Sequence, residues 1–109
     1  ILAKSAIRTG IDVLLKEAGI TADEIEEFMV AGAFGTYLSL ENAIRIGMFP
    51  DIPIDRFQQV GNAAGIGAQK LLLSESLRKE CDELVTRMHY IELTSYPDFN
   101  KILINNMRF

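Results

Sequence analysis

The chain has 109 residues, of which 49% are apolar and 24% are charged, a composition that is ordinary for one globular domain or part of one. Its net charge is −4 and no apolar run approaches the roughly 18 residues that span a bilayer, so we expect neither a nucleic-acid partner nor a membrane. The single cysteine, Cys81, excludes a disulfide, an iron–sulfur cluster or a cysteine-rich zinc site formed by this segment alone, and it fits a reducing, cytoplasmic setting.

The first predicted element is a helix that ends at Gly19, a typical C-terminal stop. The apolar residues that recur at helical spacing are Ile7, Ile11, Leu14, Leu15 and Ala18. This pattern is already under way at Ile1, without a methionine or a capping residue. We therefore expect the sequence to be an excerpt from a longer protein.

A capping box and a buried strand are predicted next. Thr21 is followed three residues later by Glu24, and Ile20 can pack on Ile25, which is the pattern of a short helical start. Residues 28–32 are apolar throughout, as expected of a strand that is covered on both faces in a parallel sheet.

Capping residues predict three further helices, which begin near Ser39, Asn62 and Ser74. The loop over 49–53 contains two prolines and is expected to be stiff. It leads into a second predicted strand over residues 57–60, just before the glycine and asparagine that start the next helix.

The last third of the chain predicts a helix, an edge strand and a terminal helix. The residues expected to face inward from the helix after Ser74 are Leu77, Cys81, Leu84, Val85 and Met88. The alternation of apolar and polar residues over 90–94 predicts a strand near an edge of the sheet, and Pro97 predicts the start of a helix. Helices and strands thus alternate along the chain, which predicts a single α/β domain with a short, mostly parallel sheet flanked by helices.

Two glycine-containing segments are candidates for ligand contact. Gly32, Ala33, Phe34 and Gly35 follow the first predicted strand, where an open α/β sheet binds ligands; the alternative is a tight turn that needs positive torsion angles. Residues 61–68 follow the second strand but match neither a dinucleotide fingerprint nor a P-loop. We expect their small side chains to serve close packing of the helix against a sheet or a neighbouring helix.

Isolated polar residues give weaker signals. His89 has no partner in the sequence, and Asp51 and Asp55 lack the further oxygen ligands of a cation site. Lys4 and Arg8 lie one helical turn apart and are expected to form a solvated face, although they could reach a phosphate. We assign no catalytic residue and no metal ligand, so the segment alone is not expected to be a complete catalyst.

Several motifs in one order resemble the C-terminal ATPase domain of reductive activators of corrinoid proteins. The matching segments are residues 3–11, 30–35, 46–53, 60–68, 90–93 and 97–99. This family is similar to acetate kinases, sugar kinases, heat-shock chaperones and actin, which have two ribonuclease-H-like subdomains with ATP in the cleft between them. The resemblance therefore implies a ribonuclease-H-like subdomain fragment, with residues 1–109 forming the C-terminal part of the ATPase domain of a longer iron–sulfur protein.

The resemblance also implies a function. The full-length protein would use ATP and Mg²⁺ to return inactive Co(II) corrinoid proteins to Co(I), with its iron–sulfur cluster and catalytic aspartates outside this segment. Gly32, Ala33, Phe34 and Gly35 would contact the adenosine. The implied partners are a corrinoid protein and the remaining subdomains of the same chain.

Two alternatives stay open at the level of sequence. One is another activator ATPase of the same superfamily, such as a hydantoinase-like or acyl-CoA dehydratase activator. The other is a non-catalytic interaction module that has lost nucleotide binding, which is favoured by Ala33 because many superfamily members have a second glycine there. We also expect the isolated segment to self-associate or to be only marginally stable, because a partial sheet exposes an edge and an apolar face.

Overall fold

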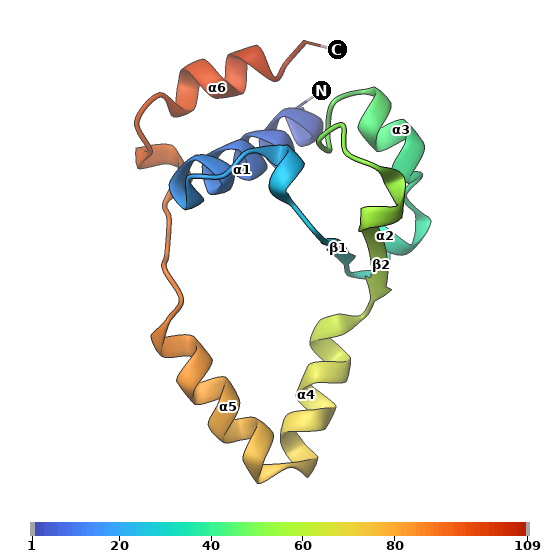
Figure 1. Ribbon diagram of the computed structural model, residues 1–109, viewed down its shortest axis with the longest axis vertical. Helices are drawn as coiled ribbons and strands as arrows, with labels where there is room; N and C mark the ends of the chain where they lie inside the picture. The colour runs from blue at the N-terminus through green and yellow to red at the C-terminus, as the bar shows by residue number, and fades with distance from the viewer. Residues whose placement is uncertain (1, 109) are drawn as a thin grey trace.

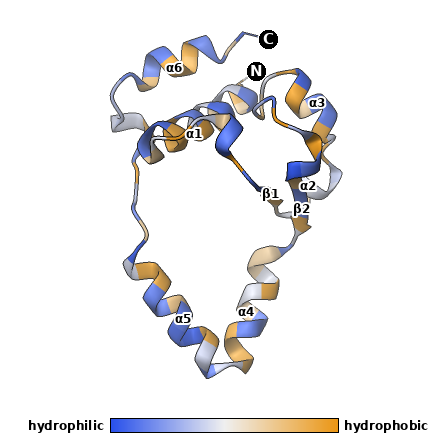
Figure 2. Cartoon of the chain, viewed as in Figure 1, coloured by the Kyte–Doolittle hydropathy of each residue, from blue (hydrophilic) through white to orange (hydrophobic). Residues whose placement is uncertain are grey.

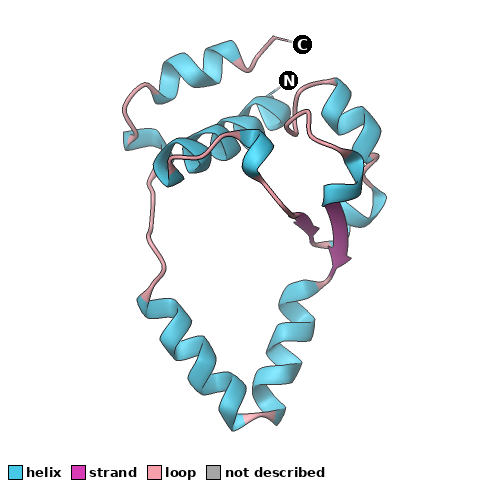
Figure 3. Ribbon diagram, in the orientation of Figure 1, coloured by secondary structure: helices cyan, strands magenta, loops and turns pink. Residues whose placement is uncertain are grey.

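The computed structural model describes residues 2–108, apart from the side chain of Phe34. Helices and two strands alternate along the chain (Figures 1 and 3). The helices are α1 (Leu2–Ala18), α2 (Ala33–Tyr37), α3 (Leu40–Arg45), α4 (Ala63–Leu73), α5 (Glu75–Thr86) and α6 (Phe99–Asn105). The strands are β1 (Phe28–Ala31) and β2 (Phe57–Gly61), and short 3-10 turns cover Ala22–Glu24, Ile54–Arg56 and Leu93–Ser95.

The two strands pair in parallel, which confirms the predicted α/β class. Phe28 lies opposite Phe57, and the register shifts by one residue after Val30, so that Ala31 lies opposite Gly61. The prediction that this strand is covered on both faces is wrong for the described chain. Phe28 and Val30 are half-buried, whereas Met29 is 60% exposed, because no other described element covers that face.

The core lies on one side of the strands and is built around three aromatic rings. The ring centroids of Phe28 lie 5.0 Å from Phe49 and 4.9 Å from Phe57, distances at which aromatic pairs attract. Ala43, Met48, Phe49, Ile52 and Phe57 are the buried residues of this cluster. The loop that contains both prolines therefore delivers the core residues Phe49 and Ile52 onto the sheet.

The predicted helix starts are confirmed by their capping hydrogen bonds. Ser39 Oγ accepts from the Asn42 amide at 3.3 Å, and Ser74 Oγ accepts from the Leu77 amide at 3.2 Å. Each bond satisfies an amide that has no partner within the helix. At the first turn of Ala22–Glu24, the Thr21 amide donates to Glu24 Oε1 at 3.1 Å, as expected of a capping box.

Two predictions for the last third of the chain are wrong. Residues 90–92 form no strand, and Leu93–Ser95 is a 3-10 turn, because the chain there crosses from α5 to α6 away from the edges of the sheet (Figure 1). Of the residues expected to face inward from α5, Leu77 and Cys81 are partly buried beside α4. The other three, Leu84, Val85 and Met88, are 52%, 58% and 68% exposed.

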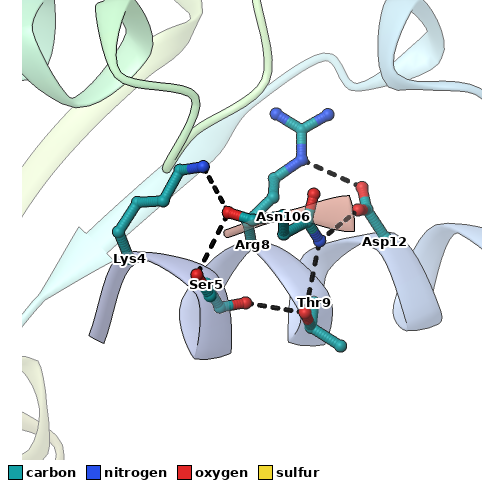
Figure 4. Close-up of polar contacts among 6 residues, drawn as sticks. All are labelled: Lys4, Ser5, Arg8, Thr9, Asp12 and Asn106. Carbon is teal, nitrogen blue, oxygen red and sulfur yellow. Dashed lines mark hydrogen bonds and ion pairs between the residues drawn. The ribbon is translucent and has the colours of Figure 1, made fainter. Parts of the chain in front are cut away.

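The C-terminal helix α6 lies against α1 and is held there by polar contacts (Figure 4). Lys4 Nζ donates to the backbone carbonyls of Asn106 and Arg108, and Ser5 Oγ donates to Asn106 O at 3.0 Å. Asn106 Nδ2 in turn donates to Thr9 Oγ1 at 3.2 Å and to Asp12 Oδ2 at 3.0 Å. These groups, which we call the α1–α6 clamp, join residues about a hundred positions apart in the sequence.

Candidate functional site

The carboxyl ends of β1 and β2 lie side by side and each is followed by a glycine-dependent turn. Gly32 has φ +93° and Gly61 has φ +64°, backbone conformations that residues with a Cβ rarely adopt. The Gly32 amide donates to Gly61 O at 2.6 Å, so the two turns are directly bonded to each other. In open α/β sheets, ligands bind at this edge, outside the carboxyl ends of the strands.

The positive φ and the position at this edge are therefore properties of the same residue.

Two helices begin at this edge of the sheet. The helix α2 starts directly after Gly32, and the Gly32 carbonyl accepts a hydrogen bond from Thr36 Oγ1 at 3.4 Å. The helix α4 starts directly after Asn62, and Asn62 Oδ1 accepts a hydrogen bond from the Gly65 amide at 3.0 Å. The predicted cap at Asn62 is thereby confirmed. A Cβ added at Gly32 would meet no atom within 4 Å, and Ala33 is exposed, so nothing in the described chain fills the space beside these two residues.

Gly35 differs from Gly32 in what it faces. A Cβ added at Gly35 would lie 2.7 Å from Val30 Cγ1, which is too close for an ordinary contact, and 3.5 Å from the Val30 backbone, which is an ordinary contact distance. Gly35 is buried, and its role in the structure is to let α2 pack closely on β1. The side chain of Phe34 lies outside the part of the chain that the structure describes.

Gln59 is a residue of this region that sequence reasoning missed. Its Nε2 donates to the carbonyl of Gly35 and, at 3.0 Å, to the carbonyl of Leu38, and these bonds tie the end of α2 to β2. The sequence feature that could have pointed to Gln59 is a polar side chain inside an otherwise apolar-bounded strand, between Phe57 and Val60. Side-chain amides placed in such strands commonly bond to backbone groups of a neighbouring segment.

Replacing Gly35 with alanine is expected to destabilise the contact between α2 and β1 by about 1–3 kcal/mol, because the added methyl group overlaps Val30. Hydrogen exchange of the β1 amides in the full-length protein measures this loss. The matched control is Gly67→Ala in α4, where a Cβ meets nothing within 4 Å and the helix gains up to about 1 kcal/mol. Equal protection in both variants would contradict the close-packing role of Gly35.

Within the described chain, neither glycine of α4 has the role that we expected, close packing against the sheet or a neighbouring helix. A Cβ at Gly65 would lie 2.4 Å from Nδ2 of Asn62, so Gly65 makes room for the cap of its own helix. Gly67 faces open space in the described chain and borders a shallow hollow between α4 and α5. No residue of α4 is buried.

The isolated candidates do not come together as a catalytic site. His89, Asp51 and Asp55 are exposed, and the described residues contain no group of three or more His, Cys, Asp or Glu side chains that could hold a metal ion. The expectation that Lys4 is a solvated residue is wrong, since it is only 6% exposed and belongs to the α1–α6 clamp. Arg8 pairs with Asp12, with 2.9 Å between Nε and Oδ1.

Tyr96 is a titratable residue at the contact between α1 and the turn before α6. Burial raises the pKa of its phenol, and the negative charge of Glu17, a hydrogen bond with Glu17 and the charge of Asp98 raise this pKa further. The phenol is therefore protonated at neutral pH and acts as a hydrogen-bond partner of α1.

Among the described helices, none is both long enough and apolar enough to cross a membrane.

Comparisons with known proteins agree on one family. A family model described as the C-terminal domain of RACo, the ASKHA domain, matches residues 1–109. The chain is similar to the corrinoid activation enzyme RamQ of Eubacterium limosum, with 39% identity over 108 residues, which cover 99% of this chain and 18% of that protein. It is also similar to a Co(II) methylated amine-specific corrinoid protein reductase of Methanosarcina barkeri, with 31% identity over 110 residues, which cover 98% of this chain and 20% of that protein.

A solved structure of a reductive activator for corrinoid, iron–sulfur protein has the same arrangement of elements. It superposes with a TM-score of 0.84 at 37% identity, over 94% of this chain and 16% of that chain. The chain thus spans about a fifth of the length of the curated relatives that it matches. Because the family model covers every residue, the chain belongs to the family of C-terminal ASKHA domains of RACo.

Proposed function

We propose that the chain is the C-terminal part of the ATPase domain of a longer iron–sulfur protein, which uses ATP to return inactive Co(II) corrinoid proteins to Co(I). The support is the family and the names of its relatives: one is a corrinoid activation enzyme, and another is a reductase of a Co(II) corrinoid protein. Since the chain spans about a fifth of these relatives, the activity belongs to the full-length protein.

Within that protein, we assign this chain the contact with adenosine through Gly32, Ala33, Phe34 and Gly35. The observation that carries the assignment is Gly32, which has φ +93°, follows a parallel strand and has open space where a Cβ would point. Ligands of open α/β sheets bind outside the carboxyl ends of the strands, and a turn without a side chain lets a flat ring approach the backbone. Gly32 and Ala33 offer the contact surface, and Gly35 supports it by packing on β1.

The other groups of the proposed reaction would be held by residues outside this segment. The described residues offer no carboxylate cluster for Mg²⁺ and carry a single cysteine, which is too few for an iron–sulfur cluster. When bound, ATP supplies binding and hydrolysis energy, and this energy shifts the protein between two states only if those states differ in affinity for the nucleotide. The proposed contribution of Gly32 and Ala33 is to orient the nucleoside in such a state.

The test is the affinity of the full-length protein for an ATP analogue after Gly32→Leu. We expect affinity to fall by about tenfold or more, which corresponds to about 1.4 kcal/mol of lost binding free energy, because the side chain occupies the space left for the ring. The matched control is Gly19→Leu, since Gly19 also has a positive φ, of +69°, and open space beside it, but it precedes β1 and lies outside the proposed site.

The two variants carry similar backbone strain, so a difference between them reports on the nucleotide contact. Unchanged affinity in a folded Gly32→Leu protein would contradict the adenosine assignment. Calorimetry that detects no binding of adenine nucleotides by the intact wild-type protein would contradict the ATPase proposal as a whole.

A further inference from the structure

Gln59 lies in the middle of β2, on the face of the strand that carries the core. Successive side chains of a strand point to opposite faces, so Gln59 shares a face with the buried Phe57, whereas Gln58 lies on the other face. Figure 2 shows the hydrophilic middle of β2 beside α2. Because the ring of Phe57 fixes β2 in the core, Gln59 extends toward α2 from a firmly held strand.

The side-chain amide of Gln59 makes two hydrogen bonds at the end of α2. Its Nε2 donates to the carbonyl of Gly35 and, at 3.0 Å, to the carbonyl of Leu38. Both acceptors are carbonyl oxygens, so the amide has to present its NH₂ group to them and not its own oxygen. The Leu38 amide donates to the same Gly35 carbonyl at 3.4 Å, which closes the last turn of α2.

The helix α2 is too short to hold its position by itself. It has five residues, whereas isolated helices shorter than about 12 residues are marginal in water. At its start, the Gly32 amide bonds to Gly61 O at 2.6 Å. In its middle, Gly35 packs on Val30. The two bonds from Gln59 add a fixed point at the opposite end of the helix.

The position of α2 sets the position of the turn before it. Gly32 is the N-cap of α2, and Ala33 is its first residue. Glycine adopts many backbone conformations at little cost, so Gly32 has no torsional preference of its own that would hold this turn. A loosened turn has to be ordered again when a ligand binds, and this ordering lowers the affinity.

We propose that Gln59 is a positioning residue of the nucleoside site, whose amide holds α2 so that the backbone of Gly32 and Ala33 is preformed for adenosine. This inference rests on the proposed adenosine contact and adds to it a residue that acts through α2. Gln59 is exposed, and water replaces exposed hydrogen bonds at small cost. We therefore expect its loss to change nucleotide affinity more than the stability of the fold.

Three substitutions of Gln59 in the full-length protein test the proposal, with calorimetry of a nonhydrolysable ATP analogue as the measurement. Gln59→Met has a similar length and no donor, and we expect affinity to fall by about three- to tenfold. Gln59→Lys keeps donors for both carbonyls, and we expect its affinity to stay within about twofold of the wild-type value. Gln59→Glu offers only acceptors to the two carbonyl oxygens, so its affinity is expected to fall at least as far as that of the methionine variant.

Two controls separate positioning from folding. We expect Gln59→Met to lower the melting temperature by less than about 2 °C, so that the protein is folded throughout the titration. Gln58→Met changes the neighbouring glutamine on the opposite face of β2, and we expect wild-type affinity. If the methionine variant at position 59 did not fold, the lysine and glutamate variants would decide in the same way.

The order of the affinities decides the proposal. Wild-type affinity in Gln59→Met, or an equal loss in the methionine and lysine variants, would overturn it. The variant Gly32→Leu is titrated in the same series to separate this inference from the adenosine assignment. If Gly32→Leu loses affinity while Gln59→Met does not, the adenosine contact stands and only the positioning role fails. If Gly32→Leu binds as the wild-type protein does, the adenosine contact fails and the positioning role fails with it.

Discussion

Replacing Phe57 with alanine is expected to lower the free energy of unfolding of this domain by about 3–5 kcal/mol, the usual cost of removing a buried phenylalanine. Phe57 is 8% exposed, and its ring centroid lies 4.9 Å from that of Phe28 and 5.8 Å from that of Phe49. The substitution therefore removes apolar burial, leaves a cavity and breaks both aromatic contacts. Hydrogen exchange of the β1 and β2 amides in the full-length protein measures the loss.

The control for this experiment keeps the position apolar. Phe57→Leu retains most of the buried volume and is expected to cost less than about 1.5 kcal/mol, because hydrophobic substitutions of similar size are tolerated best. If Phe57→Ala and Phe57→Leu reduced the hydrogen-exchange protection of the β1 and β2 amides equally, the result would contradict the view that Phe57 stabilises the domain by filling its core.

Replacing Lys4 with methionine is expected to loosen the C-terminal helix. Lys4 Nζ donates to the carbonyl of Asn106, the C-cap of α6, and to that of Arg108, which follows the helix. The last carbonyls of a helix lack partners within it. Hydrogen bonds to a charged group contribute about 1.5–3 kcal/mol, so we expect the protection of the α6 amides to fall by this amount. Methionine keeps an apolar stem of similar length, and the loss therefore reports on the ammonium group.

The matched control is Lys16→Met, in the last turn of the same helix, where the side chain is exposed. We expect its α6 protection to equal that of the wild-type protein, and we expect the β2 amides to keep their protection in both variants. A Lys4→Met protein with unchanged exchange in α6 would show that the α1–α6 clamp does not depend on the lysine.

The helix starts were predictable because the groups that make them lie within a few residues of one another. Ser39, Asn62 and Ser74 each accept a hydrogen bond from an amide three residues later. Such a bond forms as soon as the first turn forms, whatever the rest of the chain does. The parallel pairing followed from the two apolar runs and the helices between them, because a crossover connection joins parallel strands.

The candidate site was predictable only in part. The glycine at the end of the first predicted strand pointed to Gly32, and the structure adds that its turn is bonded to Gly61, which follows the other strand. The sequence did not distinguish Gly32 from Gly35, although one faces open space and the other faces Val30. That distinction depends on how α2 lies on β1, which no local pattern specifies.

The sequence by itself determined the helix caps, the two strands and the apolar residues that could form a core. Only the tertiary structure decided that Lys4 is buried, because its acceptors lie 102 and 104 residues further along the chain. It also decided that residues 90–92 form no strand, since alternation makes a strand only where another strand offers an edge to pair with. Capping hydrogen bonds depend on residues that are neighbours in the sequence, so the sequence predicts them. Burial and strand pairing depend on which distant segments pack against a residue, and only the tertiary structure shows this.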